Sequence, residues 1–396
     1  MIAIGVGILA VVLLAVTLQD AFEVMLLPRT VQRRVRLVGY YYRATWAVWT
    51  TIAHRLARER WREHFLGIYG ALSLVALFVA WAGGLIMGFG LLFWALQADL
   101  RPSVAEQLYM SGVTFFTVGY GDVAPQVWSA RLLAVIEAGT GLGFIAVVIG
   151  YLPVLYQLFA RREVHIILLD TRAGTPPTAL GLFWRHLGDD GRGQINALLA
   201  AWETWGAELL ESHLSYPMLA YYRSQHANQS WLGALTAIMD TCALLMVGRH
   251  AASQIQARMT FTMARQVLVQ MVRSFRIKPA RGADHNRLDN TAFAFLKREL
   301  TEVGLTLDED AEEMLTALRA TYEPLLNGLA RYLMLSLPGW TADRAARDHW
   351  TQGLRGTLVR HLIDELAEGP SARLEAPTRS ARAGRWRRLR SRLRSD

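Results

Sequence analysis

The strongest constraint on this chain is the segment from Phe65 to Leu96, which carries no charged residue in 32 positions. A helix needs about 20 mostly apolar residues to cross a bilayer, so this segment is long enough to span one. Two further segments qualify, Ile2 to about Leu27 and Leu132 to Ala160, the latter with Glu137 as its one charge. We therefore predict three membrane-spanning helices, which excludes a wholly soluble protein.

The composition agrees with a membrane part joined to a second part. Hydrophobic residues make up 53% of the 396 residues and charged residues only 19%, against roughly 25% in a soluble chain. The apolar excess lies in the first 160 residues. The single cysteine, Cys242, excludes a disulfide within the chain and favours a reducing compartment. Only two of the 42 basic residues are Lys, which suggests a GC-rich bacterial genome.

The charges of the loops predict an orientation. The stretch from Pro28 to His64 has nine Arg and two Glu, net +7, whereas Gln97 to Arg131 is net −1. Because Arg and Lys concentrate in cytoplasmic loops, we expect Pro28–His64 and the C-terminus inside, and the N-terminus and Gln97–Arg131 outside. The inner loop is also rich in Tyr and Trp. It fits either a helix lying in the membrane interface or an amphipathic helix packed on protein.

Between the second and third spans lies the segment SVAEQLYMSGVTFFTVGYGD, residues 103–122. Ser103 and Glu106 have the spacing of a capping box, which predicts a short helix from there to about Phe116. The negative C-terminal end of this helix would favour a cation beyond it.

The six residues that follow, TVGYGD, have the pattern of an ion-binding backbone. Gly119 and Gly121 reach backbone angles that a Cβ would hinder, so successive carbonyl oxygens can face one axis. Such a row of oxygens can replace the water shell of K⁺. Non-helical backbone at membrane depth must line a cavity or be buried in protein. We therefore predict that this segment lines a pore.

This segment resembles the selectivity filter of potassium channels, in all six residues of TVGYGD and in its place between two spans after a short helix. The resemblance covers about Phe65 to Ala160 and implies an outer helix, a pore helix, a filter and an inner helix. It implies K⁺ binding at Thr117, Val118, Gly119 and Tyr120, within a filter that runs from Thr117 to Gly121. The residues expected to support the filter are Asp122, Thr114 and Tyr109.

One chain carries one such filter, whereas a K⁺ filter uses four loops. A homotetramer is therefore expected. Two residues depart from the pattern of the family. Phe116 stands where many members have Thr, and Val113 stands where some have a Glu behind the filter. Both departures bear on how the filter gates.

The third span holds the candidates for a gate. By gapless counting from the filter, Gly141 falls at the hinge glycine of the family, although close helix packing explains a glycine there equally well. Pro153 predicts a kink, and Ile145 and Ile149, one turn apart, could form an apolar constriction. Glu137 either lines a water-filled cavity or is a protonated carboxyl bonded to the pore helix.

Residues from about 161 to 370 are predicted to form a mainly helical domain. Val164–Leu169 (VHIILL) has the pattern of a strand. The helices expected from apolar periodicity are 193–214, 217–226, 229–249, 251–275, 287–303, 309–332 and 342–367. A polar and aromatic cluster from Tyr221 to Trp231, with Asp240, fits either a ligand pocket or a helix junction.

The tail from Arg379 to Asp396 has eight Arg and one Asp. Clustered Arg near a membrane attracts anionic lipid. Nucleic-acid binding is not expected, because no folded reader domain is evident. The sequence holds no phosphate-binding loop and no metal-ligand spacing, so no cofactor or catalytic residue is expected.

The predicted fold class is an all-α membrane protein: a tetrameric potassium-channel pore with an extra N-terminal transmembrane helix and a mainly helical cytoplasmic domain. The predicted segments are the first helix (1–27), the inner loop (28–64), the pore domain (65–160), the helical domain (161–370) and the basic tail (371–396). The predicted function is passive, K⁺-selective conduction in a bacterial inner membrane, gated by an unknown ligand or stimulus of the helical domain, and not an enzyme activity. The alternatives are a weakly selective cation channel and a membrane receptor or scaffold that keeps the pore fold.

Overall fold

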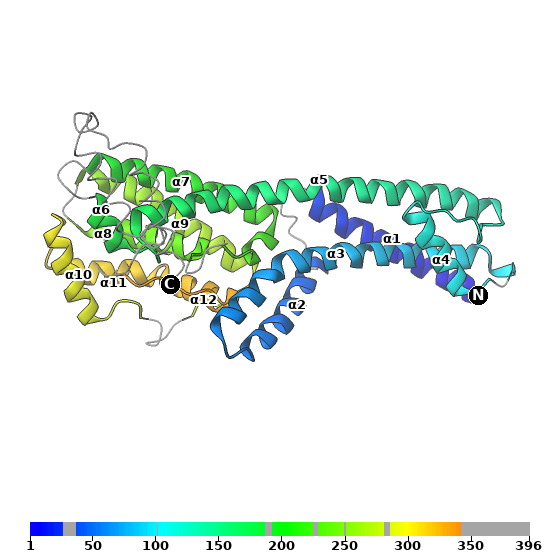
Figure 1. The fold of residues 1–396 in the computed structure, drawn as a ribbon, viewed down its shortest axis with the longest axis horizontal. Coiled ribbons are helices and arrows are strands. Elements are labelled where there is room, and N and C mark those ends of the chain that lie inside the picture. Colours follow the sequence, from blue (N-terminus) through cyan, green and yellow to red (C-terminus); the bar gives the residue numbers. More distant parts are fainter. Residues whose placement is uncertain are drawn as a thin grey trace, which may run out of the picture. The chain divides into compact units, whose positions relative to one another are not determined.

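In the computed structural model, the described residues up to 341 belong to one compact unit. The structure describes residues 1–26, 37–100, 102–186, 192–224, 229–248, 251–280 and 286–341. The α-helices, labelled in Figure 1, are α1 (Ile2–Met25), α2 (Leu37–His54), α3 (Glu59–Leu96), α4 (Val104–Phe115), α5 (Trp128–Ala173), α6 (Ala179–His186), α7 (Arg192–Ser215), α8 (Trp231–Val247), α9 (Ala251–Ser274), α10 (Asn290–Glu302), α11 (Ala311–Ala320) and α12 (Glu323–Leu333). Two short 3-10 helices, η1 (Ala98–Leu100) and η2 (Pro217–Tyr221), lie between them. The helix expected over 342–367 and the basic tail lie outside the described residues.

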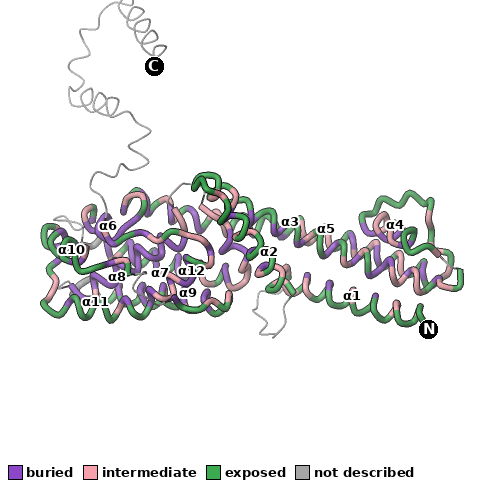
Figure 2. Tube along the Cα trace, turned by 90° about the horizontal axis from the view of Figure 1, so that it is seen from below, coloured by how far each residue is buried: buried purple, intermediate pink, exposed green. Residues whose placement is uncertain are grey.

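The helices from α6 to α12, here called the C-terminal bundle, pack around α8. Every residue of α8 except Met246 is buried (Figure 2). A helix that is apolar on all sides must be covered on all sides, and α5, α6, α7, α9, α11 and α12 all contact it. The described part of this bundle is helical, and the domain bounds of 161–370 stay a prediction. The expected helix 309–332 is divided into α11 and α12, and only a short 3-10 turn, η2, forms within 217–226.

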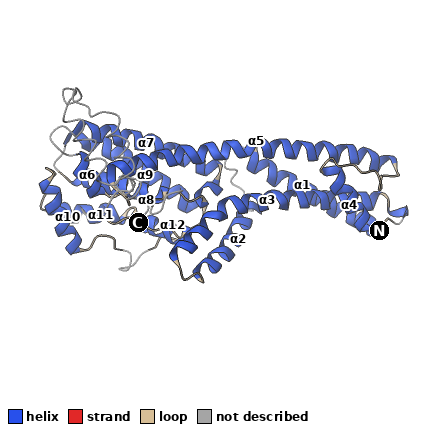
Figure 3. Cartoon of the chain, viewed as in Figure 1, coloured by secondary structure: helices blue, strands red, loops and turns tan. Residues whose placement is uncertain are grey.

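Along the described residues, helices are the only regular elements apart from one isolated bridge between Gly248 and Leu307 (Figure 3). The predicted all-α class is therefore confirmed. Three helices of the described part, α1, α3 and α5, are long and apolar enough to cross a membrane. Helices α3 and α5 contain the second and third predicted spans, and α1 covers the first from Ile2 to Met25. An all-α membrane protein is therefore confirmed.

The strand predicted over Val164–Leu169 is wrong, because this segment lies inside α5. The β-branched residues of VHIILL favour a strand locally. However, Arg162, Ile166 and Leu169 are buried on one side of α5, at the spacing of a helix face. Packing against the C-terminal bundle has overridden the local preference, and α5 continues as one helix for 46 residues.

The additional helix α1 packs along α3. Its buried residues are Ala10, Leu14, Thr17 and Ala21, which share one helix face. Leu14 lies against Gly88 so closely that a Cβ on that glycine would be 2.7 Å from it. Close approach at small residues is typical of helix packing in membranes. Trp81 of α3 also donates from Nε1 to Oδ2 of Asp20 at 3.0 Å, which provides a partner for a carboxylate near the end of α1.

Candidate functional site

The TVGYGD segment follows α4, a 12-residue helix that packs on both α3 and α5. Ser103 is extended and precedes the first helical residue, Val104, as the predicted N-cap should. Its side chain makes no capping hydrogen bond. The capping-box pattern thus predicted the start of the helix correctly, although the capping bond itself is not formed. The helix ends at Phe115, one residue before its predicted end.

Two buried glutamines, Gln97 and Gln107, join the two ends of the loop that contains TVGYGD. Gln97 donates from Nε2 to Oε1 of Gln107 on α4 at 2.9 Å. Its Oε1 accepts from the backbone N–H of Gln126, just before α5, at 2.8 Å. One side chain at the end of α3 therefore holds both the helix before the segment and the loop after it. Nothing in the spacing of these residues signalled this link.

Three alternate residues of the TVGYGD segment have positive φ: Thr117 (56°), Gly119 (60°) and Gly121 (80°). The residues between them do not. A β-strand turns successive carbonyl groups to opposite sides, whereas alternating left- and right-handed residues turn them toward the same side. The two glycines were predicted to provide this freedom. Thr117 was not, and a non-glycine residue held at positive φ is a strained position of the kind found at functional sites.

Backbone hydrogen bonds to α4 hold the first half of the segment. The N–H groups of Val118 and Gly119 both donate to the carbonyl oxygen of Val113, at 2.8 and 3.2 Å. The N–H of Thr117 donates to the carbonyl oxygen of Thr114 at 3.0 Å. The support expected from Thr114 thus comes from its backbone, and these N–H groups are turned toward α4.

A side-chain bond ties the end of the segment to the middle of α4. Tyr109 donates from its hydroxyl to Oδ2 of Asp122 at 3.0 Å. The structure therefore brings together the two other residues predicted to support the segment. They form a contact between α4 and the residue that follows Gly121.

In the single chain, every residue from Phe116 to Asp122 is exposed. The side chains of Val118 and Tyr120 are among the exposed large hydrophobic residues of the described chain. Irregular backbone at membrane depth must be buried in protein or line a water-filled cavity. One chain therefore provides only part of this site.

Behind the segment, Ser111 of α4 lies between α3 and α5. Its Oγ is 2.8 Å from the carbonyl oxygen of Ile86 and is also hydrogen-bonded to Oε1 of Glu137. A serine hydroxyl has one proton and a carbonyl oxygen can only accept. Both bonds form when Ser111 donates to Ile86 and accepts from a protonated Glu137. This geometry favours the bonded, neutral carboxyl over the cavity-lining one, because Glu137 is completely buried.

The gate candidates differ in their surroundings. A Cβ at Gly141 would be 2.0 Å from the carbonyl oxygen of Phe115, so this glycine allows α5 to pack on the end of α4. Ile149 is exposed and Ile145 half-buried, and α5 remains helical through Pro153. Close packing therefore accounts for Gly141, while a hinge there and a constriction at the two isoleucines stay predictions.

A buried arginine connects α5 to the C-terminal bundle. The side chain of Arg162 is 3% exposed and pairs with Glu163 at 3.0 Å. It donates from Nη1 to the carbonyl oxygen of Leu219 at 2.8 Å and from Nη2 to that of Tyr222 at 2.7 Å. These carbonyls belong to the turn formed by residues 217–223, here called the η2 turn. If this turn moves, either α5 must move with it or the hydrogen bonds from the Arg162 guanidinium must break.

The same η2 turn also holds α3. Arg223 pairs with Glu63 near the start of α3, with 2.5 Å between Nη1 and Oε2. Its Nη2 donates to the carbonyl oxygens of Leu333 and Met334 at 3.0 and 2.7 Å, at the end of α12. A single turn therefore links the helices on both sides of the TVGYGD segment to the bundle.

Aromatic rings complete this contact through α2. Tyr221 stacks on Tyr42 with 5.6 Å between ring centroids, and it also meets Trp46 and Tyr69. Trp46 donates from Nε1 to the carbonyl oxygen of Tyr332 at 2.8 Å. Tyr42 and Trp46 of the inner loop thus pack on protein, whereas Tyr40 and Trp61 are exposed. The cluster beginning at Tyr221 is, in its described residues, a helix junction.

His213 on α7 faces Arg162 within this junction. Its Nε2 is 3.4 Å from Nη1 of Arg162, and its Nδ1 is 3.1 Å from Oγ of Ser212. Burial, together with the charge of Arg162, lowers the pKa of His213 well below its ordinary value of 6.5. The ring is therefore neutral, with Nε2 as the acceptor that faces the guanidinium.

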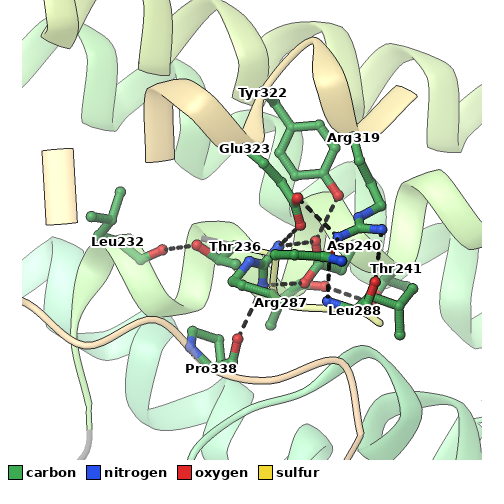
Figure 4. A network of polar contacts seen from close by, with 12 residues as sticks. Leu232, Thr236, Asp240, Thr241, Arg287, Leu288, Arg319, Tyr322, Glu323 and Pro338 are labelled. Carbon is green, nitrogen blue, oxygen red and sulfur yellow. Dashed lines mark hydrogen bonds and ion pairs between the residues drawn. The ribbon is translucent and has the colours of Figure 1, made fainter. Parts of the chain in front are cut away.

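Asp240, singled out with the Tyr221 cluster, lies elsewhere, at the centre of the C-terminal bundle (Figure 4). Its two carboxylate oxygens each accept a hydrogen bond from Arg287 at 2.8 Å, and Oδ1 accepts a third from Tyr322 at 2.7 Å. The carboxylate of Glu323 forms ion pairs with Arg287 and Arg319, with 3.1 Å between nitrogen and oxygen in each. Two carboxylates and two guanidinium groups therefore balance. The network joins α8 to α11, α12 and the segment before α10, and sequence reasoning missed its arginines.

Comparison with known proteins identifies the membrane part. Residues 74–157 match the ion channel family. Protein LctB of Geobacillus stearothermophilus is 36% identical over 95 residues, which cover 20% of this chain and 70% of that protein. Protein LctB of Bacillus caldotenax is 33% identical over the same length, again covering 70% of that protein.

A longer match is found with the uncharacterized membrane protein YdjJ of Bacillus subtilis. It is 25% identical over 192 residues, which cover 46% of this chain and 55% of that protein. No solved structure matches the chain significantly.

Proposed function

Because this chain belongs to the ion channel family, we propose that it is a potassium-selective channel that conducts K⁺ passively. The observation that carries this proposal is the alternation of positive φ at Thr117, Gly119 and Gly121 within TVGYGD. This alternation would turn the carbonyl oxygens from Thr117 to Gly121 toward one side of the segment. Four such rows around an axis would replace the hydration shell of K⁺, with no cofactor and no chemical reaction.

The proposed assembly is a homotetramer. The exposure of Val118 and Tyr120 supports it, because neighbouring copies would cover side chains that one chain leaves open. The bonds of Thr114, Tyr109 and Asp122 would then hold each strand in place. A closed ring of identical subunits is the simplest way to bring four filters together.

The proposed setting is a bacterial inner membrane, with α1, α3 and α5 as spans. The excess of Arg in residues 28–64 supports a cytoplasmic location for this loop. The N-terminus would then be outside, and the C-terminal bundle and the basic tail inside. Anionic lipid is the proposed partner of the tail.

The proposed gate lies on α5, at Gly141, Ile145, Ile149 and Pro153. The C-terminal bundle would bias it, in response to a ligand or stimulus that binds the bundle. The contacts of the η2 turn support this mechanism. Arg162 connects the turn to α5, and Arg223 connects it to α3. A rearrangement of the bundle would therefore pull on both helices that flank the filter.

The test is ion flux into liposomes that contain the purified full chain, with K⁺ or Na⁺ as the permeant cation. We expect K⁺ flux well above Na⁺ flux. Gly119→Ala should abolish this preference, because a Cβ at positive φ costs about 1–2 kcal/mol and distorts the strand. Gly67→Ala is the matched control, since a Cβ at Gly67 meets no atom within 4 Å and its φ is not positive.

Two outcomes would contradict the proposal. Equal K⁺ and Na⁺ flux that Gly119→Ala removes would show a weakly selective cation channel. The second outcome is no flux under any condition, even for Arg162→Leu, which removes the hydrogen bonds between the bundle and α5. That result would favour a receptor or scaffold that keeps the pore fold.

A further inference from the structure

The C-terminal bundle contains a cavity of about 610 Å³ that is separate from the TVGYGD segment and from the η2 turn. It lies between the start of α10, one face of α11 and the start of α12, and is here called the α11 cavity. Pockets that bind small molecules usually have volumes of about 300–1,000 Å³, so this one is large enough for a small metabolite. Its lining includes Leu288, Asp289, Phe293, Glu312, Leu315 and Arg319.

The residues that α11 contributes share one side of that helix. They recur at intervals of three and four residues, a spacing at which side chains lie next to one another along a helix. Leu315 and Arg319 are buried, whereas Glu312, Thr316 and Ala320 are exposed. The cavity therefore has a covered inner wall and an open rim.

The inner wall is largely apolar. Phe293 of α10, Leu288 just before α10 and Leu315 of α11 all line the cavity and are at most 8% exposed. Surfaces of this kind bind the hydrocarbon or aromatic part of a ligand. A bare metal ion would leave this wall unused, and among the described residues no group of three or more His, Cys, Asp or Glu is placed to hold one.

The lining carries more negative than positive charge. Three lining residues are acidic, Asp289, Glu312 and Glu323, and one is basic, Arg319, which gives a net charge of −2. Glu323 pairs with Arg319 at 3.1 Å. Asp289 and Glu312 are exposed and make no ion pair within the described part of the chain. Carboxylates without a partner cation favour a positively charged ligand over a negatively charged one.

A buried donor in the wall lacks a partner. Arg319 is 9% exposed, and its Nε has no hydrogen-bond partner among the described residues. The partners of its terminal nitrogens are Leu288, Asn286 and Glu323, which all line the cavity. The guanidinium therefore lies at the cavity wall. Since buried donors are nearly always satisfied by protein, water or ligand, this one calls for an acceptor in the cavity.

We propose that the α11 cavity binds a small organic cation, an amine that also carries an apolar side chain and a hydroxyl or carbonyl oxygen. Its ammonium group would pair with Asp289 and Glu312. Its apolar part would cover Phe293 and Leu315, and its oxygen would accept from Nε of Arg319. This inference rests on the proposed gating by the bundle and names the chemical class of the ligand.

Helix α12 connects this cavity to the membrane helices. The helix begins at the cavity with Glu323. At its other end, the carbonyl oxygens of Leu333 and Met334 accept from Arg223, which pairs with Glu63 on α3. A ligand that displaces the start of α12 would therefore act on α3 through one short helix.

Calorimetric titration of the full chain in detergent tests the site, with phenylalaninol as the probe and protein-free detergent as the blank. Phenylalaninol carries an ammonium group, a hydroxyl group and an aromatic side chain, and we expect it to bind saturably. N-acetylphenylalaninol lacks the charge and should bind about tenfold more weakly, because charged hydrogen bonds are the stronger ones. 2-Phenylethylamine lacks the hydroxyl group and should bind about two- to tenfold more weakly.

Charge variants test the two free carboxylates. Glu312→Gln and Asp289→Asn should each weaken the binding of phenylalaninol by about tenfold. Asp289→Asn keeps the cap of α10, because Asn can also accept from the backbone N–H of Ala292. Glu313→Gln is the matched control. It removes the same charge from α11 at a residue that does not line the cavity, and the affinity should stay within about twofold of the wild type.

A steric variant tests the place of binding. Ala320 lines the cavity and is exposed, so Ala320→Phe would fill the cavity without entering the core and should abolish binding. Ala317→Phe adds the same ring to an exposed position of α11 outside the lining and should bind phenylalaninol as the wild type does.

Four results would overturn the proposed ligand. The first is no saturable binding of phenylalaninol to the wild type. Equal binding of N-acetylphenylalaninol would show an apolar pocket that does not recognise charge. Equal weakening by Glu313→Gln and Glu312→Gln would show a general attraction to the acidic surface. Binding of Mg²⁺ through Asp289 and Glu312, with none of phenylalaninol, would show an inorganic cation site.

Ion flux separates this inference from the proposed function. Phenylalaninol on the side of the bundle should change K⁺ flux through the wild type and not through Glu312→Gln. K⁺-selective flux without binding of the probe would overturn the site alone. Binding to a protein that conducts no K⁺ would overturn the proposed channel and leave the site. Binding that leaves K⁺ flux unchanged would overturn the coupling through α12.

Discussion

The guanidinium of Arg162 on α5 donates to the carbonyl oxygen of Tyr222 in the η2 turn, with 2.7 Å between Nη2 and the oxygen. The turn is continuous with Arg223, which pairs with Glu63 on α3. A few residues of the bundle thus hold both long membrane helices. This relationship makes the junction the place where the proposed gating is most easily tested.

Arg162→Leu should loosen this junction. The change leaves Glu163 and two carbonyl oxygens without their partner in a buried site, which costs about 3–5 kcal/mol. We expect a clearly lower unfolding temperature of the full chain in detergent. The unfolding temperature of Arg162→Lys should lie between those of the wild type and Arg162→Leu, because an ammonium group keeps the charge but lacks the planar fork of the guanidinium. Arg161→Leu, at the exposed neighbouring position, is the control, and an equal effect there would contradict this role.

Glu137→Gln should leave K⁺ selectivity and tetramer stability nearly unchanged. The amide of Gln can donate to Oγ of Ser111, as the protonated carboxyl does, so the chain of bonds to Ile86 is preserved. Glu137→Ala removes the donor and leaves a cavity, at a cost of about 2–4 kcal/mol. The measurement is the ratio of K⁺ to Na⁺ flux for each variant. If Glu137→Gln lowered this ratio as much as Glu137→Ala, the negative charge of Glu137 would be required, and the assignment of a neutral carboxyl would be wrong.

The membrane helices and TVGYGD could be predicted because their signals are local. A run of 32 uncharged residues or a glycine pair at fixed spacing is visible without knowing any partner. The strand over Val164–Leu169 was wrong because β-branched residues were weighed without the bundle that buries Ile166 and Leu169. Apart from Glu163, which follows Arg162 directly, the partners of Arg162 and Arg287 could not be predicted, since they lie from 36 to 60 residues away along the chain and leave no periodic pattern.

Gly141→Ala distinguishes packing from hinging. The new Cβ would lie 2.0 Å from the carbonyl oxygen of Phe115, so the end of α4 must shift, and Thr117 with it. Overpacking of this kind costs about 1–3 kcal/mol. We expect reduced K⁺ selectivity and a less stable tetramer. Gly143→Ala meets no atom within 4 Å and should resemble the wild type. Slower opening with unchanged selectivity would instead indicate a hinge at Gly141.

His213 makes the junction sensitive to acid. Its pKa is lowered in the folded chain, so the unfolded chain binds more protons as the pH falls below about 6.5. Stability is then lost at up to about 1.4 kcal/mol per pH unit for this one group. His213→Gln should remove that slope, although Arg162 and Glu163 still face the site. The check is the unfolding temperature between pH 7.5 and 5 for both proteins (a range chosen to bracket about 6.5). If the unfolding temperature fell equally with pH in both proteins, His213 would not be the source of the acid sensitivity.

The Asp240–Arg287 pair should behave as one unit within the C-terminal bundle. Arg287→Leu or Asp240→Leu alone leaves a buried charge unpaired, and each should lower the free energy of unfolding by about 3–5 kcal/mol. In the double variant no charge of the pair remains, while Glu323 keeps Arg319 as a partner. Its loss should therefore be well below the sum of the two single losses. Arg298→Leu is the control, because the side chain of that arginine is 67% exposed and its contact with the buried Glu299 is long, at 3.7 Å, so its removal should cost about 0–1 kcal/mol. Strictly additive losses would mean that the two residues act through separate contacts, and the network would not hold α8 to α12 as a unit.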